Sequence, residues 1–420
     1  MTDKTAYINL TSKISSYRKT NKELNFFWTG FVIYSAAYTL TTTTTVSYVF
    51  CQLLESIGLL LFIPSAIQLI KWRFSNPYLR VVFFLYCSWQ AVIIARGFTI
   101  DYESIKLMLF DAESGLFRFL VPLILLFPKN LIYYKKIVVG IISLSLVFIF
   151  FDILFINNLL DLNYENNNTK FTFEHFVKIL SISSGVIFLT YPYQSNRTKY
   201  IALSVLLISI VFSLIRARRA LMFMTLSPII LAYILYLYER KKMYLALIIP
   251  YLIASFYLLV GFKSIDINKY KLFDLFSERL TEDTRSGVEE CFYKDMSTID
   301  WIIGKGINGK YFCPNIDLGA LTNYRVMIET DYLNIILKGG IISLGLLLLI
   351  AIPAIIKGLF YSKNILAKAA AIWILLWLIE LYPANVTTFS LHYLLFWISI
   401  GICYSKYIRN LSELTLKSAF

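Results

Sequence analysis

Apolar runs close to the length of a membrane-spanning helix recur along this chain of 420 residues. A helix needs about 20 apolar residues to cross the hydrocarbon core of a bilayer, where each backbone polar group must bond within its own segment. The composition agrees with repeated crossings: 58% of the residues are hydrophobic and 16% are charged, whereas soluble domains average about 45–50% and roughly 25%. The pattern predicts an all-α, polytopic membrane protein.

We expect about twelve transmembrane helices in a single integral membrane domain that covers residues 1–420. A large extramembrane loop, residues 263–330, separates the ninth expected helix from the tenth, and its apolar spacing predicts short helices at 270–281 and 287–303. The expected transmembrane helices lie at 25–42, 46–70, 79–95, 113–128, 136–156, 175–191, 199–215, 220–238, 243–262, 331–359, 365–382 and 388–405.

The distribution of lysine and arginine predicts the orientation, because the cytoplasmic loops of membrane proteins retain an excess of positive charge. If the N-terminus lies inside, the segments on that side hold 22 of the 40 basic residues and only four acidic ones. We therefore expect both termini in the cytoplasm and loop 263–330 on the outer face. This asymmetry also explains the net charge of +14, so no nucleic-acid partner is expected.

Three arginines interrupt the apolar sequence at "SLIRARRALMFM", residues 213–224. In the predicted topology Arg216, Arg218 and Arg219 face outside, where they oppose the positive-inside rule. Two explanations are open: the arginines bind an anionic ligand, or they pair with acidic residues of the external loop. The first explanation predicts an anion-binding site at the outer face.

The external loop carries three more arginines, Arg279, Arg285 and Arg325. It also holds Cys291 and Cys313, which either form a disulfide in an oxidising compartment or remain free thiols. We see no external cluster of histidine, cysteine and acidic residues with the spacing of metal ligands. The sequence therefore predicts neither a metal nor a cofactor.

Two further charged features precede this loop. Arg96, Lys106 and Arg118 lie in the second external segment together with four acidic residues, which predicts an external ion-pair network, or else one wall of the anion site. Glu55 lies within an expected span, and an ionisable residue at such a position is a functional candidate.

The stretches "TRSGVEECFYKDMSTIDWIIGKGI" and "ETDYLNIILKGGIISLGLLLL" carry a resemblance to a known family. With the large external loop late in the chain, they make it similar to the O-antigen polymerase (Wzy) and O-antigen ligase (WaaL) superfamily. Arg285, "IIGKGI", Asp331 to Leu333 and Gly339 match the pattern of these enzymes. Ligases carry a histidine where this chain has Glu329, and this difference favours the polymerase branch.

The resemblance implies a GT-C-like fold and metal-independent glycosyl transfer on the periplasmic side of the bacterial inner membrane. The donor would be a glycan on undecaprenyl diphosphate, polymerised into O-antigen or a related surface polysaccharide among membrane lipids, with a chain-length regulator as a possible partner. Glu329, as base for the acceptor hydroxyl, and Arg285 are the candidate catalytic residues; the other reading of Glu329 is capping of the next helix, with Asp331. The candidate diphosphate-binding residues are Arg216, Arg218, Arg219, Arg279 and Arg325.

Other functions are compatible with the same pattern. An O-antigen ligase would share the fold and the donor. A membrane transporter, including a flippase of lipid-linked glycans, would also have about twelve spans with both termini inside. Against a major-facilitator transporter, the first cytoplasmic loop, "KWRFSNPYLR", lacks the glycine and acidic pattern of that family.

Overall fold

The computed structural model describes residues 2–43, 46–97, 100–157, 172–215, 218–241, 285–314 and 323–419. These residues form helices and a single pair of two-residue strands. Seven of the helical segments are long and apolar enough to cross a membrane. The chain is therefore an all-α, multi-pass membrane protein. The count of seven falls short of the twelve expected helices, and the helix expected at 243–262 lies outside the described residues.

The first two helices form a closely packed antiparallel hairpin. Glycines allow the contact: a Cβ on Gly30 would lie 2.7 Å from the carbonyl oxygen of Gly58, and a Cβ on Gly58 would lie 2.8 Å from that of Gly30. Small residues permit such an approach where lipid supplies little hydrophobic driving force between helices. The helices of the first part of the chain are α1 (Thr2–Thr41), α2 (Tyr48–Leu69), α3 (Pro77–Ala95), α4 (Tyr102–Phe110), α5 (Leu116–Leu120), η1 (Val121–Leu126) and α6 (Leu131–Leu154).

Two of the expected spans are not continuous α-helices. The segment expected at 113–128 is the short α5 followed by the 3₁₀ turn η1, in which Pro122 supplies no N–H donor. The segment expected at 175–191 is divided among a π turn, a 3₁₀ turn and a short α-helix. The elements of this middle part are η2 (Phe176–Ser181), η3 (Ile182–Ser184), α9 (Gly185–Leu189), η4 (Tyr191–Tyr193), α10 (Asn196–Ile215) and α11 (Arg219–Glu239).

The last part of the chain contains the described portion of the large loop and the core of the bundle. α18 is buried along its whole length, and Trp373, Trp377 and Trp397 are among the largest buried side chains of the protein. The elements are α14 (Ser286–Asp295), α15 (Thr298–Ile303), β1 (Tyr311–Phe312), β2 (Tyr324–Arg325), α16 (Asp331–Phe360), α17 (Ile365–Glu380), α18 (Leu391–Tyr404), α19 (Lys406–Asn410) and α20 (Glu413–Ala419).

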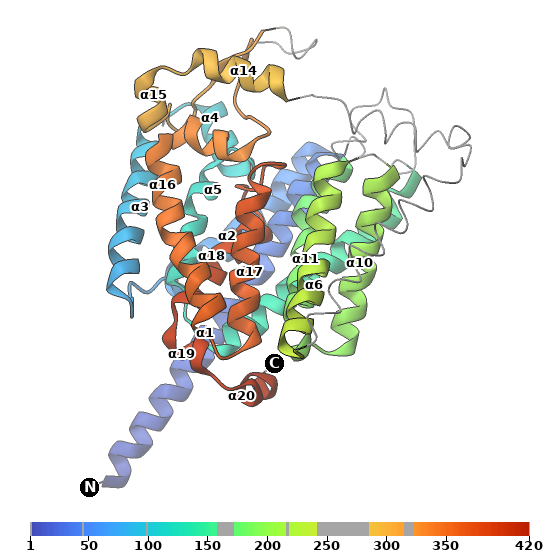
Figure 1. The fold of residues 1–420 in the computed structure, drawn as a ribbon. Helices are drawn as coiled ribbons and strands as arrows, with labels where there is room; N and C mark the ends of the chain where they lie inside the picture. Colours follow the sequence, from blue (N-terminus) through green and yellow to red (C-terminus); the bar gives the residue numbers. More distant parts are fainter. Residues whose placement is uncertain are drawn as a thin grey trace.

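Figure 1 shows α14 and α15 lying across one end of the bundle, while both termini lie at the opposite end. The C-terminal end of α10 and the N-terminal end of α11 are at the same end as α14 and α15. We call this the loop end. The predicted orientation, in which the loop end faces outside the cell, remains a prediction.

Candidate functional site

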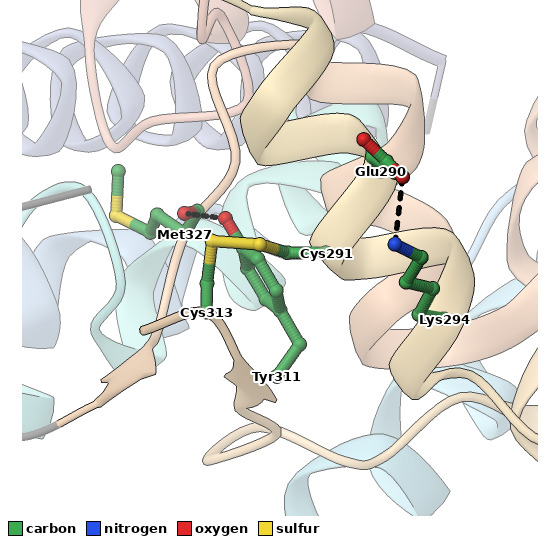
Figure 2. Close-up of a disulfide and its surroundings, with 6 residues drawn as sticks. All are labelled: Glu290, Cys291, Lys294, Tyr311, Cys313 and Met327. Atoms are coloured by element: carbon green, nitrogen blue, oxygen red, sulfur yellow. Dashed lines mark hydrogen bonds and ion pairs between the residues drawn. A yellow bond between two sulfur atoms is a disulfide. The ribbon is translucent and has the colours of Figure 1, made fainter. Parts of the chain in front are cut away.

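The described part of the large loop has a small hydrophobic core of its own. It packs Val288 and Phe292 of α14 against Tyr311 of β1 and Leu333 at the start of α16. A disulfide joins Cys291 to Cys313, whose Cα atoms are 5.2 Å apart (Figure 2). Of the two alternatives that the sequence left open, the structure therefore has the disulfide. It ties α14 to the strand pair, so this part of the loop is an ordered cap on the bundle.

The cap binds the bundle through the turn after α15. The backbone N–H groups of Lys305 and Gly306 donate to the carbonyls of Leu337 (2.7 Å) and Lys338 (2.9 Å) in α16. Arg96, at the end of α3, donates to the carbonyls of Ile303 and Gly304, each at 2.7 Å. Arg96 thus holds the cap to the bundle through backbone groups, which differs from the ion-pair network that the sequence suggested.

The start of α16 is fastened by Asp331, which is fully buried. Its carboxylate accepts hydrogen bonds from the backbone N–H of Val386 (2.8 Å) and of Thr387 (2.6 Å), from the Thr387 hydroxyl (2.8 Å) and from the Asn334 amide (3.1 Å). The segment between α17 and α18 is therefore attached to the point at which the large loop re-enters the bundle. The sequence suggested helix capping for Asp331 and did not predict these contacts.

The two candidate catalytic residues lie together at this re-entry point. Arg285 Nε is 3.5 Å from a carboxylate oxygen of Glu329, and the two side chains are 31% and 62% exposed. The Arg285 guanidinium also donates to the carbonyls of Tyr382 (3.2 Å) and Pro383 (2.6 Å). Arg285 therefore positions an accessible carboxylate while it holds α14 to the α17–α18 segment.

The arginine between α10 and α11 belongs to a second group of charges at the loop end. Arg218 pairs with Glu174 at 3.1 Å, and Glu174 also pairs with Lys178 at 2.9 Å. Arg218 thus pairs with an acidic residue, as the second explanation from the sequence proposed. That residue, Glu174, lies just before η2 and not in loop 263–330. Arg218 remains 30% exposed.

Glu113 and His175 form the neighbouring pair, with 3.3 Å between His175 Nε2 and a Glu113 oxygen. Burial raises the pKa of the Glu113 carboxyl, but the positive charges of His175, Lys178 and Arg118 outweigh burial and lower this pKa to about 2. Glu113 is therefore ionised at neutral pH. The other histidine, His392, is buried in the core and lies 2.7 Å from Glu380, so within the described residues neither histidine contacts Glu329.

The remaining predicted arginines are placed as follows. Arg219 is the exposed first residue of α11, and Arg325 lies half-buried on β2, opposite Tyr311. Arg216 and Arg279 lie outside the described residues. The structure thus brings Arg285 and Glu329 together and places Arg218 in a separate ion-pair network at the same end of the molecule (Figure 1).

Two buried basic residues are further functional candidates. Lys338 was not predicted from the sequence, and Arg118 was expected in an external ion-pair network or in one wall of the anion site. Arg118 and Lys338 are buried cations that line one small cavity beneath the cap. The sequence signal for Lys338 was its position within the apolar run "NIILKGGIISL". Burying a charged side chain in a membrane span is energetically unfavourable unless a partner stabilises the charge. In the described part of the chain, no group of three histidine, cysteine or acidic residues could hold a metal ion.

A comparison with known proteins gives no match, whether with families, with curated proteins or with solved structures. The family resemblance therefore depends on the motifs of the sequence. What the geometry adds is an exposed carboxylate beside an arginine, held by a disulfide-closed cap at the re-entry point.

Proposed function

We propose that this chain is a glycosyltransferase that polymerises undecaprenyl-diphosphate-linked oligosaccharide repeats into O-antigen or a related polysaccharide, at the outer leaflet of a bacterial inner membrane. The observation that carries the proposal is the Arg285–Glu329 pair, 3.5 Å apart and accessible at the loop end. The family motifs around these residues support it. So does the predicted position of the loop end on the periplasmic face.

Glu329 is the proposed base. At 62% exposed, its carboxylate can be reached by a sugar hydroxyl, and Arg285 lies beside it at 3.5 Å. The acceptor oxygen loses its proton to Glu329 and attacks the anomeric carbon of the donor, while the bond from that carbon to the lipid diphosphate breaks. Negative charge grows on the departing diphosphate, so cations beside it lower the barrier.

Arginines suit the diphosphate because their planar donors meet phosphate oxygens in pairs and their charge is permanent. We assign this role to Arg218, Arg219 and Arg325, together with Arg216 and Arg279. The partly exposed Arg218 has donors beyond its bond to Glu174 and lies at the same end of the molecule as the proposed base. Arginines on the predicted outer face are unfavourable under the positive-inside rule. Binding of a polyanionic ligand would explain why the sequence places them there.

The proposal is tested with purified protein, a synthetic undecaprenyl-diphosphate repeat and electrophoresis of the products. We expect Glu329→Gln to lower the rate of polymer formation by about 10²–10⁴-fold, because the amide cannot accept the proton. Glu329→His should retain part of the activity, since imidazole is also a base. Lys294→Gln alters an exposed pair of the same cap and serves as the control. Full activity of the Glu329→Gln protein would contradict the proposal.

The acceptor distinguishes a polymerase from a ligase. A polymerase extends the lipid-linked chain, whereas a ligase transfers a finished chain to lipid A. Products that carry many repeats on undecaprenyl diphosphate support polymerisation. A single transfer to lipid A, with no chain growth, would assign the protein to the ligase branch.

A lipid-linked glycan transporter is the second candidate, favoured by Glu55. This carboxylate lies within the spanning helix α2, is fully buried, and neither of its oxygens has a hydrogen-bond partner among the described residues. Such residues mark ion or substrate pathways in transporters. If Glu55→Gln stopped flipping of a fluorescent lipid-linked glycan in vesicles while Glu329→Gln did not change polymer growth, this candidate would replace the first.

A further inference from the structure

A small cavity lined by polar and apolar side chains lies beneath the cap, where α3, α5, α16, the α17–α18 segment and α18 meet. Its volume is about 20 Å³. That is room for one water-sized occupant. Arg118 and Lys338 line it from two sides, with Gln90, Thr387 and Tyr393 among the other lining residues.

Both basic side chains are buried. Arg118 is 4% exposed and Lys338 is 2% exposed. In the described residues no carboxylate lies within ion-pair distance of either one. Asp111 acts on the charge of Lys338 from a greater distance, but its oxygens accept hydrogen bonds from Tyr38, Glu113 N–H and Ser114 instead. The ionised Glu113 likewise acts on the charge of Arg118 from beyond ion-pair distance. Among the described residues, the cavity thus holds two basic side chains with no carboxylate in direct contact with either one.

Most of the donors on these two side chains have no acceptor among the described residues. A guanidinium has five N–H donors and an ammonium has three. Within the described part of the chain, Arg118 donates one hydrogen bond, to the carbonyl of Glu113 at 3.1 Å, and Lys338 donates one, to the carbonyl of Gly309 at 2.8 Å. Buried charges are stable when they are paired or fully hydrogen-bonded. The cavity is thus lined by N–H donors of both side chains and by the permanent positive charge of Arg118, with room for a single small occupant.

We propose that this cavity binds a monatomic anion of the halide class, chloride in the cell, between Arg118 and Lys338. The size of the cavity selects the occupant, because one water-sized position accepts a halide but not a phosphate group with its four oxygens. The anion carries one negative charge, so it offsets one of the two positive charges while it accepts hydrogen bonds from both side chains. It also links α5 to α16 and, through the Lys338 bond to Gly309, the bundle to the cap. The proposal does not depend on the proposed enzymatic function.

The first test measures the unfolding midpoint of the purified full-length protein in detergent. Chloride is titrated against gluconate at constant ionic strength, and bromide replaces chloride in a parallel series. We expect the midpoint to rise and saturate with either halide, because a ligand that binds only the folded state stabilises it. Lys338→Met and Arg118→Met should lose this dependence, whereas the control Lys294→Met, on the exposed surface of the cap, should keep it.

A second measurement covers the case in which the cavity variants do not fold. Bromide-soaked crystals of the unmodified protein should show an anomalous peak between Arg118 and Lys338. A midpoint that does not respond to halide, or a bromide peak elsewhere with none in the cavity, would overturn the proposal. Stabilisation by pyrophosphate but not by halide, lost in Lys338→Met, would also overturn it and assign the cavity to a phosphate ligand. None of these readouts depends on glycosyl transfer.

Discussion

At the scale of single residues, Glu329 and Asp331 show how position in the fold separates a candidate catalytic group from a structural one. Both are carboxylates beside the start of α16, and helix capping was a reading of both from the sequence. In the structure Glu329 is 62% exposed and pairs with Arg285, whereas Asp331 is fully buried and accepts four hydrogen bonds. The first can meet a substrate, and the second holds the backbone of the α17–α18 segment.

We therefore predict that Asp331→Ala lowers the free energy of unfolding by about 3 kcal/mol or more, because it strands the N–H groups of Val386 and Thr387 in the interior. Asp331→Asn should cost less, since the amide oxygen can accept part of this set. The measurement is the unfolding midpoint in detergent. Lys294→Ala is the control, because an exposed ion pair contributes at most about 1 kcal/mol. Equal midpoints for Asp331→Ala and the control would show that these hydrogen bonds do not hold the segment.

At the scale of elements, α16 is two helices joined at a kink. Gly340 has φ of +66°, a conformation that residues with a side chain rarely adopt. The kink brings the backbone against α15: a Cβ on Gly340 would collide with the carbonyl group of Ile302. The first half of α16 thereby ends beneath the cap, where Lys338 lines the small cavity described above. The second half of α16 continues through the bundle.

Gly340→Ala should lower the free energy of unfolding by at least about 1–3 kcal/mol, from backbone strain alone, and should loosen the cap. Gly345→Ala is the matched control on the same helix, since a Cβ there meets nothing within 4 Å; it should change stability by less than about 1 kcal/mol. Unfolding midpoints test stability, and proteolysis of the cap tests its attachment. If the two alanine variants behaved alike, the kink would not be a constraint on the fold.

At the scale of the whole molecule, both termini lie at one end and the cap at the other (Figure 1). In a membrane this arrangement places the cap and the termini on opposite faces. The excess of basic residues on the predicted inner side predicts that the termini face the cytoplasm. The disulfide agrees with an outer, oxidising face for the cap, because disulfides persist there and are rare in the cytosol.

Cysteine labelling tests this orientation directly. We expect Lys294→Cys, on the exposed surface of α14, to react with a membrane-impermeant maleimide in intact cells. Lys417→Cys, on exposed α20, should react only after the membrane is opened. Of the free cysteines among the described residues, Cys51 and Cys403 are buried and Cys87 is half-buried on α3, so the labelling of the parent protein is measured as the background. The reverse pattern would invert the topology and remove the proposed periplasmic site.

The multi-pass membrane character of this protein, the positions of the spanning helices that the structure describes and the short helices expected at 287–303 could be predicted from the sequence. The short helix expected at 270–281 lies outside the described residues. Those features follow from local patterns: the length of apolar runs, their helical spacing and the bias of basic residues. The pairing of Arg285 with Glu329, the burial of Asp331 and the cavity of Arg118 and Lys338 could not. Each joins residues tens to hundreds of positions apart, and no local pattern records such contacts.

The breaks in the expected spans were decided by tertiary packing as well. An apolar run indicates that a segment is buried in lipid or in protein. It does not indicate whether the segment crosses the membrane as one continuous helix. Most side chains of residues 116–127 and 176–190 are buried, and these segments form short helices and turns; residues 172–189 are still apolar and long enough to cross a membrane. The sequence by itself thus determined that this chain folds in a lipid bilayer rather than in water. Its tertiary structure decided which charges meet, because only packing brings distant backbone and side-chain groups into one low-dielectric space.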